Sequence, residues 1–406
     1  MRVGEISMPT TAAAVPARAR VWAAVWLVVL AAGLVADGVY LARAPLAEGV
    51  TDFHQFRHSS RAWLEDAPMY EPVPQGDRVV FNLNPPHFHL VVLPFVGLPL
   101  YLGFAVWMAA GIAALVWVLW QLLPQWFATL REPLWPLALL AWLFVTPITG
   151  SVLVTGAPVW VMLPILYAAW QAHRHGRLAR AGAFIGVLAS MKLFLLLLLP
   201  WFLLRGEWRA VRAALLGVAI SSGIGVAVFG VEAYAGWIEA MRASEGWAWG
   251  QLNASVAALT TRAFTETPYW LPLSTDVPAR ALWVILAVSL LFLTGERIGA
   301  LSVDSGWALL LTTALLVNPL GWIYYLWWLL PLLLVTGMGQ GFSPASARRV
   351  AMCGAAFLTI PPWAVFAAQP SRVATLTLGT AYVWGLVCLW ISCLLLTTRS
   401  SAQASS

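Results

Sequence analysis

Apolar runs long enough to cross a lipid bilayer recur along almost the whole of this 406-residue chain. A helix needs about 20 apolar residues to span the hydrocarbon core of a membrane. The segments expected to be helical are 21–41, 87–98, 101–123, 134–148, 152–171, 181–191, 193–204, 213–230, 281–295, 305–317, 319–337, 350–367 and 375–396. The polar sequence between them leaves no room for a soluble domain of ordinary size, so we predict an all-α polytopic membrane protein.

Composition supports this reading and excludes other classes. Hydrophobic residues make up 61% of the chain and charged residues only 10%, whereas soluble domains are about 25% charged. The net charge of +6 comes from arginines scattered among short loops, so no nucleic-acid partner is expected. Cys353, Cys388 and Cys393 lie in late apolar segments with no CxxC pair, which predicts neither a disulfide nor a metal site.

Arginine-rich segments predict which side of the membrane each loop faces, because such loops stay in the cytoplasm. The segments expected there are the N-terminal tail 1–20, the loops 172–180, 205–212 and 343–349, and the tail 398–406. The apolar stretch that follows the first tail is longer than that of a signal peptide and is expected to be retained. A single transmembrane domain, 21–397, then has its two long polar stretches, 42–86 and 231–280, on the outer face.

Lys192 interrupts the apolar run 181–204. A lysine at the centre of a spanning helix costs about 2.5–3.5 kcal/mol. Two short half-helices that meet at Lys192 would instead turn it toward a protein-lined cavity, where non-helical backbone is tolerated. One helix with Lys192 snorkelling along a neighbour is the alternative. One segment between 87 and 171 must also be re-entrant or too short to cross, so about 11 crossings are expected.

Asp52 stands just after the first predicted helix. A carboxylate at this place would lie at the mouth of a cavity between helices and could act as a general base on a sugar hydroxyl. A lipid phosphate leaving group would then need positive charge, which Lys192 or a loop arginine could supply. Alternatively, Asp52 is an N-cap for a loop helix that starts near Phe53.

Motifs for other chemistries are missing from the sequence. His54 and His58 are spaced to share a helix face, but no third ligand is evident, so no metal site is expected. The chain has no Asp-x-Asp motif, no P-loop and no glycine-rich dinucleotide fingerprint. This favours a donor delivered within the membrane over a nucleotide sugar, and no cofactor is expected.

Several short motifs occur in a characteristic order and spacing between residue 52 and about residue 330. They are Asp52 with Phe56; Pro68, Tyr70 and Pro72; Phe81 to Pro86; Ala181-Gly182 to Lys192 followed by Arg205; Gln251-Leu252-Asn253-Ala254-Ser255 with Arg262; and Asn318-Pro319-Leu320-Gly321-Trp322-Ile323-Tyr324-Tyr325. Together they resemble the GT-C class of membrane glycosyltransferases. Within it they are similar to the polyprenyl-phosphate-mannose-dependent mannosyltransferases, glycosyltransferase family 87.

The resemblance implies a GT-C-like bundle with its active site at the outer face of the cell membrane. It also implies inverting transfer of a sugar, with mannose expected, from a polyprenyl phosphate to a lipid or glycan acceptor of the envelope. Asp52 would be the catalytic base. The residues expected to bind donor phosphate are Lys192, Arg262 and Tyr324. Those expected to bind substrate are His54, Tyr70, Asn84, Gln251, Asn253 and Trp322.

The chain departs from the family pattern at three places. Phe56 stands where Tyr is commoner, and Gly156-Ala157-Pro158-Val159 replaces a Gly-Gln-x-Asn turn. Trp322-Ile323-Tyr324-Tyr325 replaces a Trp-x-His motif, so Tyr324 can donate a hydrogen bond but brings no positive charge. These differences bear on the identity of the sugar more than on the reaction class.

Two other functions fit a polytopic chain. A transporter or flippase of lipid-linked sugars would be expected to show an internal repeat and short loops, and the sequence shows neither. A polymerase or ligase that moves a glycan from a diphosphate lipid would need more arginine on the outer face. The two long polar stretches on one side favour the glycosyltransferase.

Overall fold

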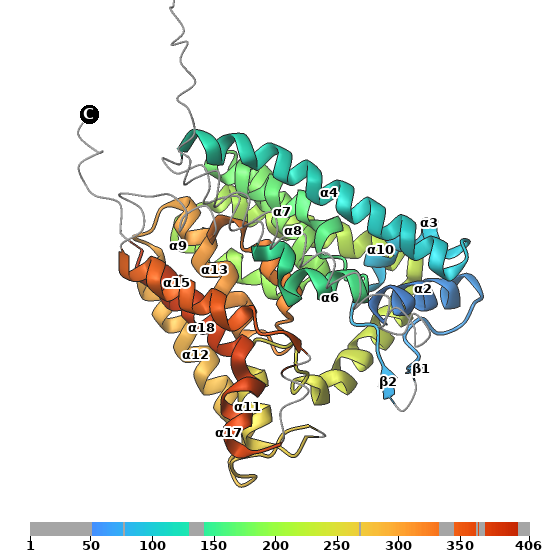
Figure 1. The fold of residues 1–406 in the computed structure, drawn as a ribbon. Coiled ribbons are helices and arrows are strands. Elements are labelled where there is room, and N and C mark those ends of the chain that lie inside the picture. The colour runs from blue at the N-terminus through green and yellow to red at the C-terminus, as the bar shows by residue number, and fades with distance from the viewer. Residues whose placement is uncertain are drawn as a thin grey trace, which may run out of the picture.

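The computed structural model describes residues 51–75, 78–129, 142–267, 269–332, 345–362, 364 and 370–396. These residues form a mostly helical protein (Figure 1). Its α-helices are α2 (Thr51–Leu64), α3 (His89–Val96), α4 (Leu100–Thr129), α6 (Pro147–Thr155), α7 (Val159–Arg174), α8 (Leu178–Met191), α9 (Leu198–Leu204), α10 (Trp208–Ala243), α11 (Val256–Phe264), α12 (Ala279–Ile298), α13 (Val303–Val317), α15 (Ala345–Leu358), α17 (Arg372–Leu376) and α18 (Ala381–Leu394). The 3₁₀ turns are η2 (Pro86–Phe88), η3 (Leu193–Leu197), η4 (Ser244–Trp247), η5 (Ile323–Trp328) and η6 (Leu378–Thr380).

Helices that could cross a membrane confirm the predicted membrane class. Among the described residues four are long and apolar enough: Leu100–Leu122, Trp208–Ala243, Ala279–Ile298 and Arg372–Leu394. The pair α6 and α7 is bent by 118° and counts as a fifth if it forms one broken span. The predicted number of about 11 crossings therefore stays a prediction, and the first predicted helix, 21–41, lies outside the described residues.

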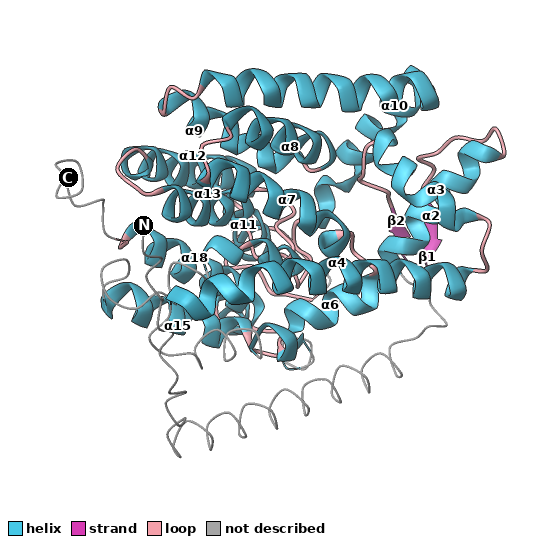
Figure 2. Ribbon diagram, turned by 90° about the horizontal axis from the view of Figure 1, so that it is seen from above, coloured by secondary structure: helices cyan, strands magenta, loops and turns pink. Residues whose placement is uncertain are grey.

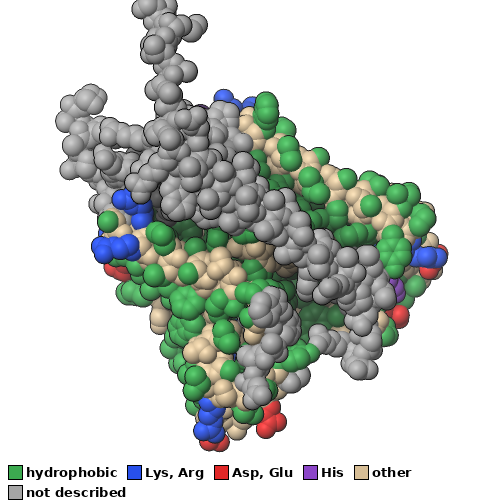
Figure 3. Space-filling view, viewed as in Figure 1, with side chains coloured by type: hydrophobic (Ala, Val, Ile, Leu, Met, Phe, Trp, Pro, Cys, Tyr) green, Lys and Arg blue, Asp and Glu red, His purple; other side chains and the backbone are tan. Residues whose placement is uncertain are grey.

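The outer surface of the bundle is suited to lipid. Only 17% of the most apolar stretch of α12 and 22% of that of α10 are buried inside the protein. Hydrophobic side chains cover much of the face in Figure 3, and its charged side chains gather near the margins. Because exposed apolar surface on this scale is not stable in water, these faces are expected to contact membrane lipids.

Helices α8 and α10 pack with their backbones in close contact. A Cβ atom added to Gly182 would overlap the carbonyl oxygen of Ala210, and one added to Gly186 would overlap that of Ala214. Small residues permit this close approach, which favours helix association in a membrane. The contact fixes α8, and therefore the residue at its C-terminal end, against the long helix α10.

That residue is Lys192, where the predicted interruption is present. Helix α8 ends at Met191, and Lys192 has extended backbone angles (φ −135°, ψ 90°) before η3 begins. A second break falls at Gly230, whose φ of 80° is left-handed, a conformation that glycine adopts readily. Residues 231–243 then continue as helix, so the predicted outer stretch 231–280 begins with an ordered helical segment rather than a loop.

The stretch 42–86 is also folded where it is described. It contains α2 and an antiparallel hairpin of β1 (Val73–Gln75) and β2 (Arg78–Val80), in which Val73 pairs with Val80. Figure 2 shows the hairpin beside α2 and α3 at one end of the helical bundle. The two long stretches meet there, because the Trp237 indole donates to the Leu83 carbonyl at 3.1 Å and the rings of Phe81 and Trp247 lie 5.6 Å apart.

Candidate active site

A cavity of about 730 Å³ opens where the two long polar stretches meet the break after α8. This volume lies in the usual range of ligand-binding pockets. The lining residues are Asp52, Gln55, Phe56, Val80, Phe81, Leu83, Asn84, Thr155, Pro158, Met191, Lys192, Leu193, Phe194, Trp237, Met241, Ser244, Trp247, Leu252, Val317, Asn318, Pro319, Leu320, Trp322, Tyr324 and Tyr325. Segments that are far apart in sequence therefore form one site.

Asp52 lies in the first turn of α2 and faces the cavity. Burial raises the pKa of its carboxyl from 3.8 to about 6, although Lys192 and the Tyr324 hydroxyl act in the opposite direction. The Tyr324 hydroxyl lies 3.4 Å from Asp52 Oδ2, to which it donates. Because Asp52 already lies within the helix, it does not occupy the expected cap position before Phe53.

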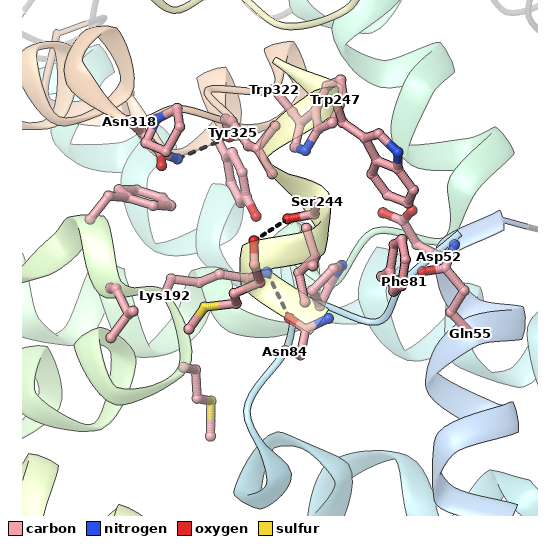
Figure 4. A pocket seen from close by; sticks show the side chains of 18 of the residues that line it. Asp52, Gln55, Phe81, Asn84, Lys192, Ser244, Trp247, Asn318, Trp322 and Tyr325 are labelled. Carbon is pink, nitrogen blue, oxygen red and sulfur yellow. Dashed lines mark hydrogen bonds between the residues drawn. The ribbon is translucent and has the colours of Figure 1, made fainter. Parts of the chain in front are cut away.

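Lys192 supplies positive charge to the same cavity. Its Nζ donates to Asn84 Oδ1 at 2.7 Å and lies 5.6 Å from the centre of the Tyr325 ring. No carboxylate of the described residues lies within ion-pair distance of this ammonium. An ammonium has three donors, so the neutral Asn84 partner leaves Lys192 able to bind an anion. Figure 4 shows Asp52 and Lys192 on opposite sides of the cavity.

Aromatic side chains form much of the remaining wall. Phe81 and Trp247 stand beside Asp52, and Trp322 and Tyr325 line another side (Figure 4). The Trp322 ring lies 6.4 Å from that of Tyr324 at an interplanar angle of 27°. Flat apolar faces combined with a few polar groups suit a sugar ring, which has both apolar C–H faces and hydroxyl edges.

Arg262, expected to bind phosphate, lies elsewhere. Its side chain is fully buried, and it donates to the carbonyls of Trp249 at 2.8 Å, Asn253 at 2.9 Å and Gly379 at 2.6 Å, and also to that of Gly250. Burial lowers its pKa to about 9, so it remains charged at neutral pH. In this arrangement Arg262 holds the backbone of the second polar stretch and does not line the cavity.

The neighbouring predicted residues also act on the backbone. Asn253 Nδ2 donates to the carbonyls of Ala248 at 3.0 Å and Pro319 at 2.7 Å, and the Asn253 backbone pairs with Trp322. Gln251 is buried without a hydrogen-bond partner for its Nε2 among the described residues. Neither lines the cavity, but both lie beside residues that do, so this segment positions Leu252 and Trp322.

His54 and Tyr70 complete the predicted set. His54 lies on α2 with its ring 6.5 Å from that of His58, and it does not line the cavity. No group of three metal-binding side chains occurs among the described residues. The Tyr70 hydroxyl donates to the Asn84 carbonyl at 2.6 Å, so Tyr70 holds a lining residue rather than lining the cavity itself.

Several lining residues were not predicted, although the spacing of the sequence contains a signal for them. Gln55 follows Asp52 by three positions on α2, so it shares a helix face with it. Trp237, Met241 and Ser244 are similarly spaced by four and three positions. Residues 231–280 are expected to form a loop, where helical spacing carries no information, but the structure continues α10 to Ala243.

Comparison with known protein families gives a match over the middle of the chain. The model of glycosyltransferase family 87 matches residues 82–319, which is more than half of the chain. No curated protein and no solved structure matches the amino-acid sequence of this protein. The matched range includes Asn84 and Lys192 but begins after Asp52 and ends before Tyr324. The chain belongs to glycosyltransferase family 87.

Proposed function

We propose that the protein transfers a sugar, with mannose expected, from a polyprenyl phosphate to a lipid or glycan acceptor at the outer face of the cell membrane. The observation that carries this proposal is the cavity itself, where the described residues provide one carboxylate, Asp52, and one cation, Lys192, that forms no ion pair with any carboxylate among them. The carboxylate can accept a proton and the cation can accept a phosphate.

The reaction follows from these two groups. Asp52 takes the proton of an acceptor hydroxyl as the hydroxyl oxygen attacks the anomeric carbon of the donor. The bond between that carbon and the phosphate oxygen breaks, its electron pair leaves with polyprenyl phosphate, and the new negative charge lies next to Lys192. Attack from the face opposite the leaving group inverts the anomeric centre. A base with a pKa of about 6 is stronger than an ordinary aspartate, yet it is mostly ionised at neutral pH.

The charge of the lining supports a monophosphate donor. Lys192 is the sole lysine or arginine, and Asp52 the sole acidic residue, among the described residues that line the cavity. A diphosphate lipid or a nucleotide sugar carries more negative charge and would favour additional cationic groups or a metal site. One lysine is a better match for one phosphate, which argues against the polymerase alternative. Membership of a glycosyltransferase family argues against a flippase.

The test is transfer from radiolabelled polyprenyl-phosphate sugars to a membrane lipid and glycan extract by the purified protein. Wild type should transfer label, whereas Asp52→Asn and Lys192→Met should transfer it far more slowly at the same donor concentration. Glu65→Gln is the matched control, because Glu65 lies just after α2 in an exposed ion pair with Arg61. Transfer from nucleotide sugars, with none from any polyprenyl phosphate, would refute the proposed donor.

A further inference from the structure

A continuous chain of hydrogen bonds runs from the Lys192 ammonium to the buried side chain of His89, the first residue of α3. Lys192 Nζ lies 2.7 Å from Asn84 Oδ1, and Asn82 Oδ1 lies 3.0 Å from the Asn84 backbone nitrogen and 3.3 Å from Asn84 Nδ2. Asn82 Nδ2 lies 2.8 Å from His89 Nε2. The His89 side chain is fully buried and does not line the cavity.

Two groups in this chain fix the direction of its bonds, because each can only donate. The backbone N–H of Asn84 requires that the oxygen of the Asn82 side chain faces it. The Lys192 ammonium requires that the oxygen of the Asn84 side chain faces the cavity. The amide nitrogen of Asn84 then donates to Asn82, and the amide nitrogen of Asn82 points toward His89.

The protonation of His89 follows from this direction. Its Nε2 must accept from Asn82, so the proton of the neutral ring is on Nδ1. Nδ1 donates to Ser60 Oγ at 2.7 Å, and the Ser60 hydroxyl donates to the Phe56 carbonyl at 2.8 Å. The second N–H of Asn82 donates to Ser59 Oγ at 2.8 Å. If the His89 ring were protonated on both nitrogens, its Nε2–H would face the N–H of the Asn82 amide, and neither group could accept.

We propose that His89 is a positioning residue for Lys192, acting through Asn82 and Asn84. The hydrogen bonds to Ser59 and Ser60 extend this series to α2, and its other end is Lys192 at the break after α8. These hydrogen bonds therefore connect α2, which contains the proposed base Asp52, with the break that contains Lys192 on the other side of the cavity. The inference rests on the proposed role of Lys192 in binding the donor phosphate.

Single variants test the position of Lys192 through donor kinetics. His89→Phe keeps a ring that can pack against Tyr70 and Phe229 but removes both nitrogens. We expect at least a tenfold increase in the KM for the polyprenyl-phosphate sugar and an unchanged KM for the acceptor. His89→Gln places an acceptor oxygen near the position of Nε2 and should restore most of the donor KM.

The matched control is His173→Phe. His173 is also buried, but it accepts from the Trp307 indole and faces Glu207, apart from the cavity. This variant should lower thermal stability and leave the donor KM unchanged. If His89→Phe does not fold, Asn82→Leu breaks the same chain at its next member and should raise the donor KM in the same way.

A double-mutant cycle decides between positioning and general packing. Lys192→Met should raise the donor KM, and His89→Phe should then add nothing to it. Additive effects, or a His89→Gln variant as impaired as His89→Phe, would overturn the proposal. An effect of Lys192→Met without one of His89→Phe would overturn it while leaving the proposed function intact. No effect of Lys192→Met would overturn it together with the role of Lys192.

Discussion

Replacing Asp52 with asparagine separates the catalytic role of this residue from any structural one. Asparagine is nearly the same size and can still accept the hydrogen bond from Tyr324, but it cannot take a proton at neutral pH. General-base catalysis contributes about 10²–10⁴-fold. We therefore expect Asp52→Asn to lose at least ~10²-fold in turnover while it keeps its affinity for the donor.

The same change should stabilise the folded protein, because the wild-type carboxyl is costly to ionise where it lies. Its pKa is raised from 3.8 to about 6, and each pKa unit corresponds to about 1.4 kcal/mol, so the ionised form is disfavoured by about 3 kcal/mol. A raised pKa gives stability that is fully present below about pH 4 and is lost as the pH rises through about 6. The advantage of Asp52→Asn should therefore be small near pH 4 and largest above pH 6.

The assay is turnover and melting temperature in detergent for Asp, Asn, Glu and Ala at position 52, each measured at pH 5 and pH 8. Glutamate keeps the charge but moves it by about one methylene, so its turnover should fall between those of Asp and Asn, since misplacing a base by ~1 Å is expensive. Asn should melt above wild type at pH 8, and by a smaller margin at pH 5.

An active Asp52→Asn variant would refute the reasoning. If Asp52 had only a structural role at the start of α2, the Asn variant would keep its turnover. An equal margin between Asn and wild type at both pH values would show instead that burial does not raise the pKa of Asp52. Asp66 and Glu239 would be the next carboxylates to test.

Four further outcomes are expected. Lys192→Met should fold and express but use the donor poorly, and Lys192→Arg should keep part of the activity, as initial rates against donor concentration will show. Arg262→Met leaves several buried carbonyls without a donor and should lower the free energy of unfolding by at least ~3 kcal/mol, seen as a lower melting temperature. The rate of transfer should rise with pH through about 6 and level off above it, as deprotonation of Asp52 requires. In a background without native cysteines, a cysteine at Thr267 should react with an impermeant thiol reagent on intact cells, and one at His175 should not; labelling of both would contradict the assigned topology.

The break at Lys192 was predictable because its cause is local. A charge in the middle of an apolar run is costly in a membrane whatever the rest of the fold does. The meeting of the two polar stretches was predictable for a similar reason, since arginine-rich loops assigned both stretches to one side. The structure brings residues of both stretches, Asp52 and Trp247 among them, to one cavity.

The roles of Arg262 and Asn253 could not be predicted in this way. An arginine in a polar stretch and an asparagine near an aromatic both resemble ligand-binding residues in sequence. The carbonyls that they bind belong to distant segments: Gly379 lies 117 positions from Arg262, and Pro319 lies 66 positions from Asn253. Whether a polar side chain meets a ligand or the backbone depends on this tertiary proximity, which no local pattern contains.

His89 was not singled out by the sequence, and its role depends on contacts that the fold supplies. It stands at the start of an apolar segment and is fully buried, where a polar side chain is costly unless it finds hydrogen-bond partners. The network holds the side-chain amide of Asn84 in place, and this amide is the hydrogen-bond partner of Lys192. Because the amide is neutral, it binds the ammonium without cancelling its charge. A carboxylate in place of Asn84 would hold Lys192 equally close but would neutralise the positive charge of its ammonium. A neutral acceptor holds the ammonium in place and leaves its charge to the phosphate of the donor.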